Sequence, residues 1–287
     1  MENTSEHIKA LRERTGAGIM ECKKALTETK GDLEKAIDLL RQKGIAKAAK
    51  KAERETSEGR IGTATSSDRK RVSFVKLSCE TDFVAKNELF ADLVNNIAKA
   101  VLDANTDDIN KILTLPYPGG KGSIDEQIKE LIGKIGENMQ LQEATIIDAQ
   151  KGIIDVYAHL GNKLAVMVEI HSDKQNVEEL TKLAHELAMQ IAIDNPDYVC
   201  REEVPTDVVD REREVIKASP DLASKPDAVK EKIVDGKLGA FFGTCCLLEL
   251  PYMRDGNLKI KDVVSETSKK LGAKVDVICF KRASIGK

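Results

Sequence analysis

Residues 78–87 read Ser-Cys-Glu-Thr-Asp-Phe-Val-Ala-Lys-Asn and join two segments of different periodicity. Upstream, residues 71–79 are rich in β-forming residues, and Val75, Leu77 and Cys79 fall on one face at a period of two. Downstream, apolar residues recur at helical spacing, at Phe90, Leu93, Val94, Ile97 and Val101. We therefore expect this stretch to form a corner between a strand and a helix.

Four residues, Thr81-Asp82-Phe83-Val84, stand at this corner. Thr81 and Asp82 are both good N-cap residues, because their side-chain oxygens accept hydrogen bonds from the first turn of a helix. In one interpretation, Asp82 caps the helix and Phe83 staples it to the strand. In the other, the corner is a wedge that presents an aromatic ring and a carboxylate to a partner. The pattern alone favours capping and leaves both interpretations open.

The composition argues against several classes of function. A chain of 287 residues is long enough to bury a sizeable core and to form two or more domains. Its 45 basic and 48 acidic residues nearly balance, it has no Trp, and only 3% of its residues are aromatic. These values give no electrostatic argument for a membrane partner, and no electrostatic or base-stacking argument for a nucleic-acid partner.

The N-terminal residues and the cysteines indicate a cytoplasmic protein. Residues 1–6 are polar and acidic, without the basic and apolar regions of a signal peptide. The longest apolar run, residues 240–250, is too short and too interrupted to span a bilayer. The six cysteines are scattered without a C-x-x-C pair, which is typical of reduced thiols in the cytosol.

The first 55 residues are expected to form a three-helix domain with a helical linker. The periodicity predicts three short helices within residues 5–43, the last of them capped by Asp32 and ended by Gly44. Ile19 and Met20 follow a glycine-containing loop, so one of them could stay exposed as an adaptable contact, although packing in the core is the commoner fate. Residues 46–55 are rich in Ala and Lys and favour a solvated linker over a nucleic-acid-binding helix.

The middle of the chain repeats one pattern, a hairpin followed by a helix. Residues 60–65 and 71–79 form the first predicted hairpin, and residues 153–160 and 163–170 form the second, joined by a Gly161-Asn162 turn. We interpret the repeat as two similar subdomains, residues 56–145 and 146–287, each an antiparallel sheet with helices on one face.

The last third of the chain carries an insertion. Residues 203–242 are helical and charged, which indicates a protruding pair of antiparallel helices. A final strand–helix–strand is expected, with strands at residues 244–250 and 274–280 and a helix containing Ile260 and Leu271. The predicted fold class is therefore α+β.

Motifs for catalysis are missing from the sequence. Residues 119–123 are rich in Gly but lack the spacing of a phosphate-binding loop. His185-Glu186 begins like a zinc-binding helix, but Met189 stands where the second His belongs, and the four histidines make no ligand spacing. We expect no metal, no cofactor and no active site, and an interaction protein as the default.

Two long stretches resemble the signatures of the bacterial elongation factor Ts family. They are residues 11–26, Leu-Arg-Glu-Arg-Thr-Gly-Ala-Gly-Ile-Met-Glu-Cys-Lys-Lys-Ala-Leu, and residues 79–86, Cys-Glu-Thr-Asp-Phe-Val-Ala-Lys. Residues 134–138, Lys-Ile-Gly-Glu-Asn, are a third familiar string. The resemblance extends from about residue 5 to 282. Lys76 and Ser78 depart from the Glu and Asn that are more frequent in the family.

The resemblance implies a guanine nucleotide exchange factor for the translational GTPase elongation factor Tu, bound in its GDP-loaded and nucleotide-free forms. The partner would hold the nucleotide, so none would bind this chain directly. By similarity, Asp82 and Phe83 form a wedge that displaces Mg²⁺ from the GTPase, and Thr81 and Val84 hold it. The N-terminal helices would form a ubiquitin-associated-like domain.

The resemblance also implies further partner contacts. Arg12, Ile19 and Met20 would touch a helix near the guanine-binding side of the GTPase, and His159 and Gly161 would touch the partner farther away. An ordinary histidine beside a turn is an equal alternative for His159. Three rival functions stay open: a GTPase-binding adaptor or chaperone without exchange activity, an RNA- or ribosome-binding protein using residues 41–54, and an enzyme with an unrecognised site.

Overall fold

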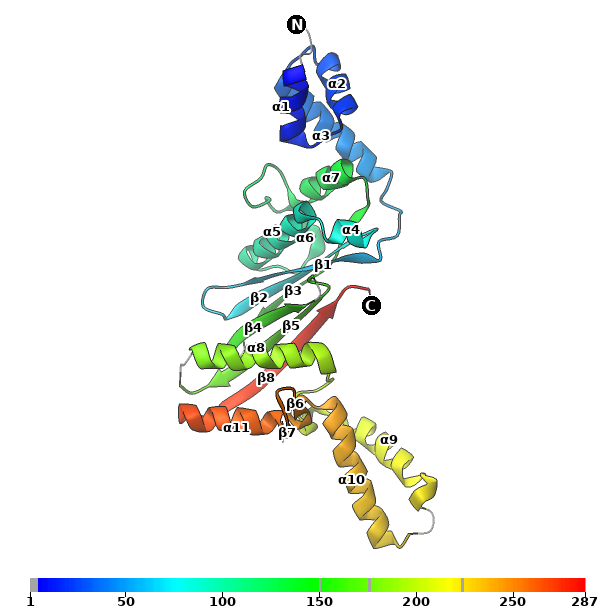
Figure 1. The fold of residues 1–287 in the computed structure, drawn as a ribbon, viewed down its shortest axis with the longest axis vertical. Coiled ribbons are helices and arrows are strands. Elements are labelled where there is room, and N and C mark those ends of the chain that lie inside the picture. Colours follow the sequence, from blue (N-terminus) through cyan, green and yellow to red (C-terminus); the bar gives the residue numbers. More distant parts are fainter. Residues whose placement is uncertain (1–4, 150, 160, 175–176, 223–224, 287) are drawn as a thin grey trace.

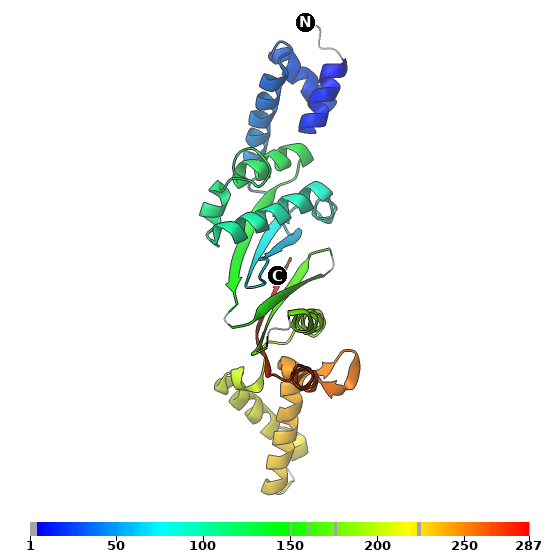
Figure 2. The ribbon, with the colours of Figure 1, turned by 90° about the vertical axis from the view of Figure 1, so that its left-hand side faces the viewer.

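The computed structural model describes residues 5–149, 151–159, 161–174, 177–222 and 225–286. The molecule is elongated, with the N-terminal helices at one end, two sheets in the middle and a pair of helices at the other end (Figures 1 and 2). Antiparallel sheets and segregated helices confirm the α+β class. The domain boundaries at residues 55 and 145 stay predictions.

Three helices form the N-terminal end: α1 (Ser5–Thr15), α2 (Ile19–Glu28) and α3 (Leu33–Ala49). They enclose a small apolar cluster of Leu11, Cys22, Ala25, Leu26 and Ala36. Asp32 caps α3 as predicted, accepting a hydrogen bond from the Lys35 N–H at 3.1 Å. The predicted end of this helix at Gly44 is wrong, because α3 continues to Ala49 and packs along α7.

The predicted linker therefore begins inside α3. Ala48, near the end of α3, is buried in the apolar core of the next part of the chain. Its burial stabilises the helix beyond Gly44, where the sequence pattern indicated a stop.

The first sheet contains β1 (Glu58–Thr65), β2 (Arg71–Cys79) and β3 (Met139–Asp148), antiparallel in that order. The hairpin of β1 and β2 confirms the prediction, whereas β3 was not foreseen. Four helices accompany the sheet: α4 (Asp82–Ala85), α5 (Glu88–Ala104), α6 (Ile109–Thr114) and α7 (Ile124–Ile135). Ser123 begins α7 with a capping box formed with Glu126. Helices α5 and α7 share an apolar core with one face of β2.

The second sheet contains β4 (Ile153–His159), β5 (Leu164–Ser172) and β8 (Val275–Ser284), again antiparallel in that order. Helix α8 (Val177–Asp194) packs on its outer face and shares a core with α11 (Ile260–Leu271). The sheets face each other through Ile61, Val72, Phe74, Ile154, Ala165 and Met167. In the second hairpin, Gly161 and Asn162 both have positive φ, at 66° and 64°, as the predicted turn requires. Leu160, which we assigned to β4, lies outside the described residues.

The predicted insertion is a helical pair, α9 (Thr206–Lys217) and α10 (Asp227–Cys245), preceded by the 3-10 turn η1 (Arg201–Glu203) and joined through η2 (Pro220–Leu222). The pair encloses a small apolar cluster of its own, Ile216, Leu222, Val234 and Leu238. Figure 1 shows it projecting from the end of the molecule.

The predicted strand at residues 244–250 is wrong. Helix α10 runs to Cys245, and residues 247–249 form a 3-10 turn, η3 (Leu247–Glu249), followed by the small hairpin of β6 (Pro251–Tyr252) and β7 (Asp255–Lys259). The N–H groups of Leu247 and Leu248 donate to the carbonyls of Tyr198 and Val199, at 2.8 and 3.0 Å. These bonds to a loop replace the ladder that a strand would need. Within the described ranges, no helix is long and apolar enough to cross a membrane.

Candidate functional site

The most exposed large apolar side chain among the described residues is Phe83, which is 81% exposed. It lies in the single-turn helix α4, whose next residues, Val84 and Ala85, are 6% and 4% exposed and belong to the first core. Thr81 is the N-cap, and its hydroxyl accepts a hydrogen bond from the Val84 N–H at 3.4 Å. The interpretation in which Asp82 caps the helix and Phe83 staples it is therefore wrong. The buried side chains of Val84 and Ala85 anchor the turn in the first core, and the Phe83 ring points outward.

Glu137 holds this corner from a distant part of the chain. Its carboxylate accepts hydrogen bonds from the Thr81 N–H, at 3.0 Å, and from the Thr81 hydroxyl, at 2.8 Å. Hydrogen bonds to a charged acceptor are stronger than neutral ones. Thr81 therefore caps α4 while it is itself held through both its backbone and its side chain.

A second contact ties the same two segments together. The Asn138 N–H donates to the Glu80 carboxylate at 2.6 Å, and the buried Asn138 amide donates to the Arg54 carbonyl at 2.7 Å. Sequence reasoning did not identify Glu80, Glu137 and Asn138 as functional. The signal available was the string at residues 134–138, which carried no assigned role.

Charged side chains lie next to the exposed Phe83 ring, beginning with its neighbour Asp82. The Asp82 carboxylate accepts a hydrogen bond from the Lys86 ammonium at 2.7 Å, and this bond lowers the pKa of Asp82 below its ordinary value. Lys163 contributes to the same shift, although it belongs to the second hairpin. Lys163 in turn pairs with Glu58 of β1. The second hairpin therefore adds its charge to the environment of the corner.

The tip of the second hairpin lies against the edge of the first sheet. The Ile61 N–H of β1 donates to the Asn162 carbonyl at 2.8 Å, and the Asn162 amide donates to the Ile61 carbonyl at 3.2 Å. Gly161 is exposed, and a Cβ built on it would meet no atom within 4 Å. His159 is half-buried, with its Nδ1 atom 2.6 Å from the Tyr157 hydroxyl. Their partner-binding roles stay predictions.

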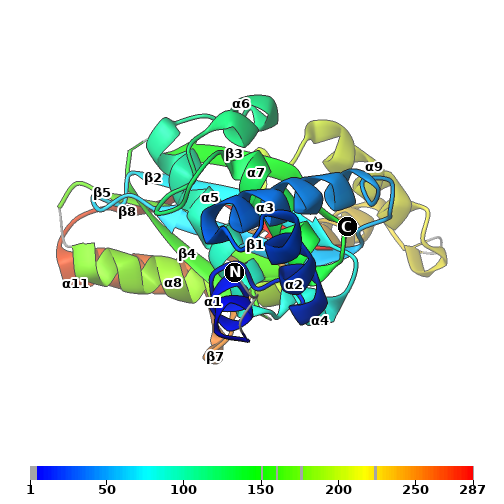
Figure 3. The ribbon, with the colours of Figure 1, turned by 90° about the horizontal axis from the view of Figure 1, so that it is seen from above.

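The N-terminal helices present a second apolar surface. Ile19 and Met20, at the start of α2, are 55% and 64% exposed. The sequence pattern allowed one of them to stay exposed, and in the structure both lie outside the core. We call these two residues the N-terminal patch. Arg12, on α1, is also exposed. Figures 1 and 3 show α2 and α4 on the same flank of the molecule. One broad partner could therefore touch the patch and Phe83 together.

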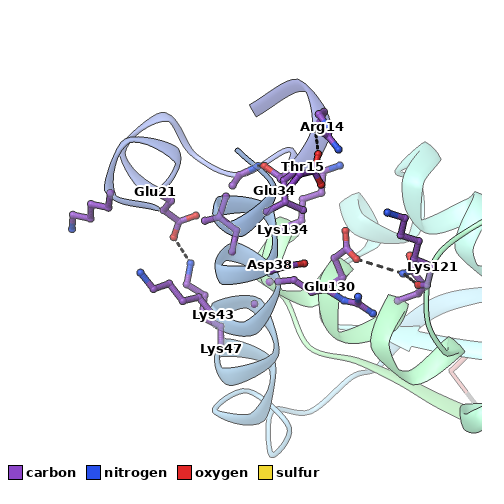
Figure 4. Close-up of a pocket in the computed structure, with 18 residues that line it drawn as sticks. Arg14, Thr15, Glu21, Glu34, Asp38, Lys43, Lys47, Lys121, Glu130 and Lys134 are labelled. Carbon is purple, nitrogen blue, oxygen red and sulfur yellow. Dashed lines mark hydrogen bonds and ion pairs between the residues drawn. The ribbon is translucent and has the colours of Figure 1, made fainter. Parts of the chain in front are cut away.

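Two cavities lie among the described residues, and the second is lined by Arg69, His185 and Glu186, with His185 Nδ1 2.8 Å from the Asp155 carboxylate. A cavity of about 430 Å³ lies between the N-terminal helices and α7 (Figure 4). Ion pairs among the N-terminal helices lie along its wall, Arg14 to Glu34 at 2.7 Å and Lys47 to Glu21. Throughout the part of the chain that the structure describes, no three His, Cys, Asp or Glu side chains are grouped as metal ligands. The exposed apolar residues Phe83, Ile19 and Met20 are taken as the candidate site because of their exposure.

Comparison with known proteins identifies the family of the chain. The family model described as Elongation factor TS matches residues 80–287, beginning at the residue before Thr81. An Elongation factor Ts of Clostridium botulinum (strain ATCC 19397 / Type A) is 39% identical over 284 residues, which span 99% of this chain and 92% of the relative. Those of Clostridium tetani and Syntrophotalea carbinolica are 39% and 37% identical over 99% and 100% of this chain and 93% and 94% of their own lengths. The chain belongs to the elongation factor Ts family of translation elongation factors.

Proposed function

We propose that this chain is a guanine nucleotide exchange factor for elongation factor Tu and that it acts by binding, without covalent chemistry. The observation that carries the proposal is Phe83, an aromatic ring 81% exposed on a turn whose neighbours are buried. Large apolar side chains that stay in water at a rigid corner are typical of interfaces. The family resemblance supports the same residue as the point that enters the GTPase.

Burying the Phe83 ring in the partner would release enough free energy to change the affinity of the GTPase for its nucleotide. Transferring a Phe side chain from water to an apolar site is worth about 2–3 kcal/mol. If this burial takes place only when the GTPase has released its hold on GDP, it weakens GDP binding roughly 30- to 150-fold. The effect is reciprocal, so GDP weakens the binding of the exchange factor by the same factor.

The four corner residues have different roles in this proposal. Phe83 would insert between helices of the GTPase, and Asp82 would bring a carboxylate beside the displaced segment. Thr81 and Val84 keep the turn rigid, Thr81 through Glu137 and Val84 through burial in the core. Because Mg²⁺ requires near-ideal octahedral geometry, a small displacement of its surroundings weakens both the ion and the nucleotide.

The other predicted contacts give affinity and orientation. Ile19 and Met20 would bury apolar surface against the same GTPase domain, with Arg12 beside them, and the second hairpin would add His159 and Gly161. The exposed fractions of Ile19 and Met20, 55% and 64%, support this assignment. Two separated contacts on one partner bind more tightly than either alone when their spacing is fixed.

The test is the release of a fluorescent GDP analogue from elongation factor Tu in excess unlabelled GDP. Adding catalytic amounts of this protein should accelerate release, with a rate that saturates as its concentration rises. Measurable binding without acceleration would contradict the proposal and identify the chain as an adaptor. A steep salt dependence of RNA binding, together with no GTPase binding, would favour the ribosome-binding alternative.

A further inference from the structure

Helix α7 and the residues that follow it contact two segments. One is the corner that carries Phe83, and the other is the loop that leads to the N-terminal patch. After the C-terminal end of α7, Glu137 accepts the two hydrogen bonds from Thr81 that hold the Phe83 turn. Within its last turn, Lys134 reaches toward the N-terminal helices, where Figure 4 shows it near Thr15 and Glu34. It also lies against Gly16, in the loop that leads to Ile19. One helix is therefore linked to both segments.

Helix α7 also crosses α3 with the two backbones in contact. A Cβ atom built on Gly133 would lie 2.7 Å from the Gly44 Cα, a distance that real Cβ atoms do not adopt. A Cβ atom built on Gly44 would lie 3.9 Å from the Gly133 Cα, an ordinary van der Waals contact. The crossing therefore requires glycine at residue 133 but not at residue 44.

Polar contacts hold the helices together on both sides of the crossing. Arg41, one turn before Gly44, forms an ion pair with Glu126 of α7 at 2.7 Å. Lys51, just after α3, donates to the carbonyl of Gly136, the C-cap of α7. These contacts and the close backbone approach define one arrangement of α3 on α7.

We propose that Gly133 is a positioning residue for nucleotide exchange. By allowing α3 to approach α7 at Gly44, it sets the separation between the N-terminal patch and Phe83 that the GTPase must match. This inference rests on the proposed function. Fixing the spacing in advance removes the cost of ordering two mobile parts when the partner binds.

The chain offers a matched pair of variants, Gly133→Ala and Gly44→Ala. Alanine is a better helix former than glycine, so neither change weakens its own helix. Only Gly133→Ala adds a methyl group where the opposing backbone leaves no room. Gly44→Ala is therefore the control for the loss of a glycine at the same crossing.

The geometry is measured first, without the partner. Spin labels are attached through unnatural amino acids at Lys9 of α1 and Lys111 of α6, which are both exposed. The distance between the labels reports the separation of the N-terminal helices from the helices of the first sheet. We expect the label distance to change in Gly133→Ala and to match the wild type in Gly44→Ala. An unchanged distance in Gly133→Ala would overturn the proposal.

The GDP-release assay then tests the role in exchange. Gly133→Ala should require roughly tenfold more protein for half-maximal acceleration, because both residues of the N-terminal patch lose part of their contact. Its maximal rate should stay near that of the wild type, because the Phe83 turn is untouched. Gly44→Ala should behave like the wild type in both quantities.

A double-mutant cycle separates positioning from a general loss of structure. Met20→Ala should raise the half-saturating concentration in the Gly44→Ala background and have little effect in the Gly133→Ala background, where the patch is already displaced. A full Met20 effect in both backgrounds would contradict the proposal. Arg41→Gln, which removes the ion pair to Glu126 without adding bulk, serves as a second variant if Gly133→Ala does not fold.

Failure of the inference and failure of the proposed function give different results. No acceleration by the wild type would overturn the exchange function itself. A changed label distance with unchanged exchange by Gly133→Ala would leave that function intact and overturn only the positioning role.

Discussion

Glu137 accepts two hydrogen bonds from Thr81, one from the backbone N–H at 3.0 Å and one from the hydroxyl at 2.8 Å. The two residues are 56 positions apart in the sequence. Their contact fixes the base of the turn that exposes Phe83. The rigidity of the proposed contact point thus depends on a residue outside the corner itself.

Replacing Glu137 by Ala should destabilise the protein and reduce exchange. Two hydrogen bonds to a carboxylate are lost and a half-buried N–H loses its acceptor, which costs about 1–3 kcal/mol. Thermal unfolding and GDP release measure the two effects. Glu143→Ala, an exposed position on β3, is the control and should leave both unchanged. Normal stability and normal exchange in Glu137→Ala would show that the contact is dispensable.

Met20→Ala should weaken binding of the proposed GTPase partner by about 1 kcal/mol, or roughly fivefold. Because Met20 is 64% exposed, the free energy of unfolding should change by less than about 0.5 kcal/mol. Titration calorimetry gives the affinity. Val215→Ala removes a side chain 62% exposed on α9, at the opposite end of the molecule, and should bind normally. Equal losses in both variants would exclude a specific N-terminal contact.

Glu249 should make the stability depend on pH below about 4.5. Its side chain, 9% exposed, pairs with Arg201 at 2.9 Å, Lys259 at 2.8 Å and Lys261 at 3.2 Å, which joins the base of the helical pair to β7 and α11. The hydrogen bond from Arg201, with those from the two lysines, lowers the pKa of Glu249 to about 2. A lowered pKa in the folded state stabilises the fold above the unfolded value of 4.5, and this stabilisation is lost as the pH falls toward 2.

The size of the stabilisation by Glu249 follows from the same pKa. The full shift corresponds to about 3 kcal/mol at neutral pH, but the three cations are 42–48% exposed, so screening reduces the expected value to about 1–2 kcal/mol. Urea unfolding of Glu249→Gln should show this loss at pH 7 and a much smaller one near pH 2. Glu231→Gln, an exposed carboxylate on α10, is the control. A loss that does not depend on pH would contradict the assignment.

The cysteines should react slowly in the folded protein. All six are free, and burial raises the pKa of Cys79 and Cys246 to about 12 and that of Cys279 to about 11. At pH 8, a thiol with a pKa of 11 is ionised in about one molecule in a thousand, and the thiolate is the reactive form. Ellman's reagent should therefore label Cys79, Cys246 and Cys279 slowly in the native protein, and all six thiols after denaturation. Rapid labelling of Cys79 in the native protein would contradict its buried environment.

The sequence predicted the elements whose signals are local. The strands β1 and β2, the cap at Asp32 and the positive-φ turn at Gly161 all depend on neighbouring residues, and all were confirmed. Strand β3 was missed because polar residues, among them Gln140, Gln142 and Glu143, interrupt its apolar pattern at the edge of the sheet.

The errors arose where distant contacts decide the local structure. Residues 244–250 form an apolar run that suits a strand or a buried turn equally, and bonds to Tyr198 and Val199 select the turn. Gly44 is typical of a helix end, yet α3 continues to Ala49, with Gly44 packed against Gly133 and Ala48 buried in the next core. The exposure of Phe83 was undecided because the contact that fixes its turn comes from Glu137, outside the local pattern.

The role of Phe83 is tested by comparing Phe83→Ala with Leu89→Ala in the GDP-release assay. Both variants remove an exposed apolar side chain near the corner, 81% and 44% exposed, so both should fold as stably as the wild type within about 0.5 kcal/mol. We expect Phe83→Ala to lose roughly 30- to 150-fold in its acceleration of GDP release, and Leu89→Ala to retain it. Equal acceleration by Phe83→Ala and the wild type would contradict the claim that this ring displaces the nucleotide.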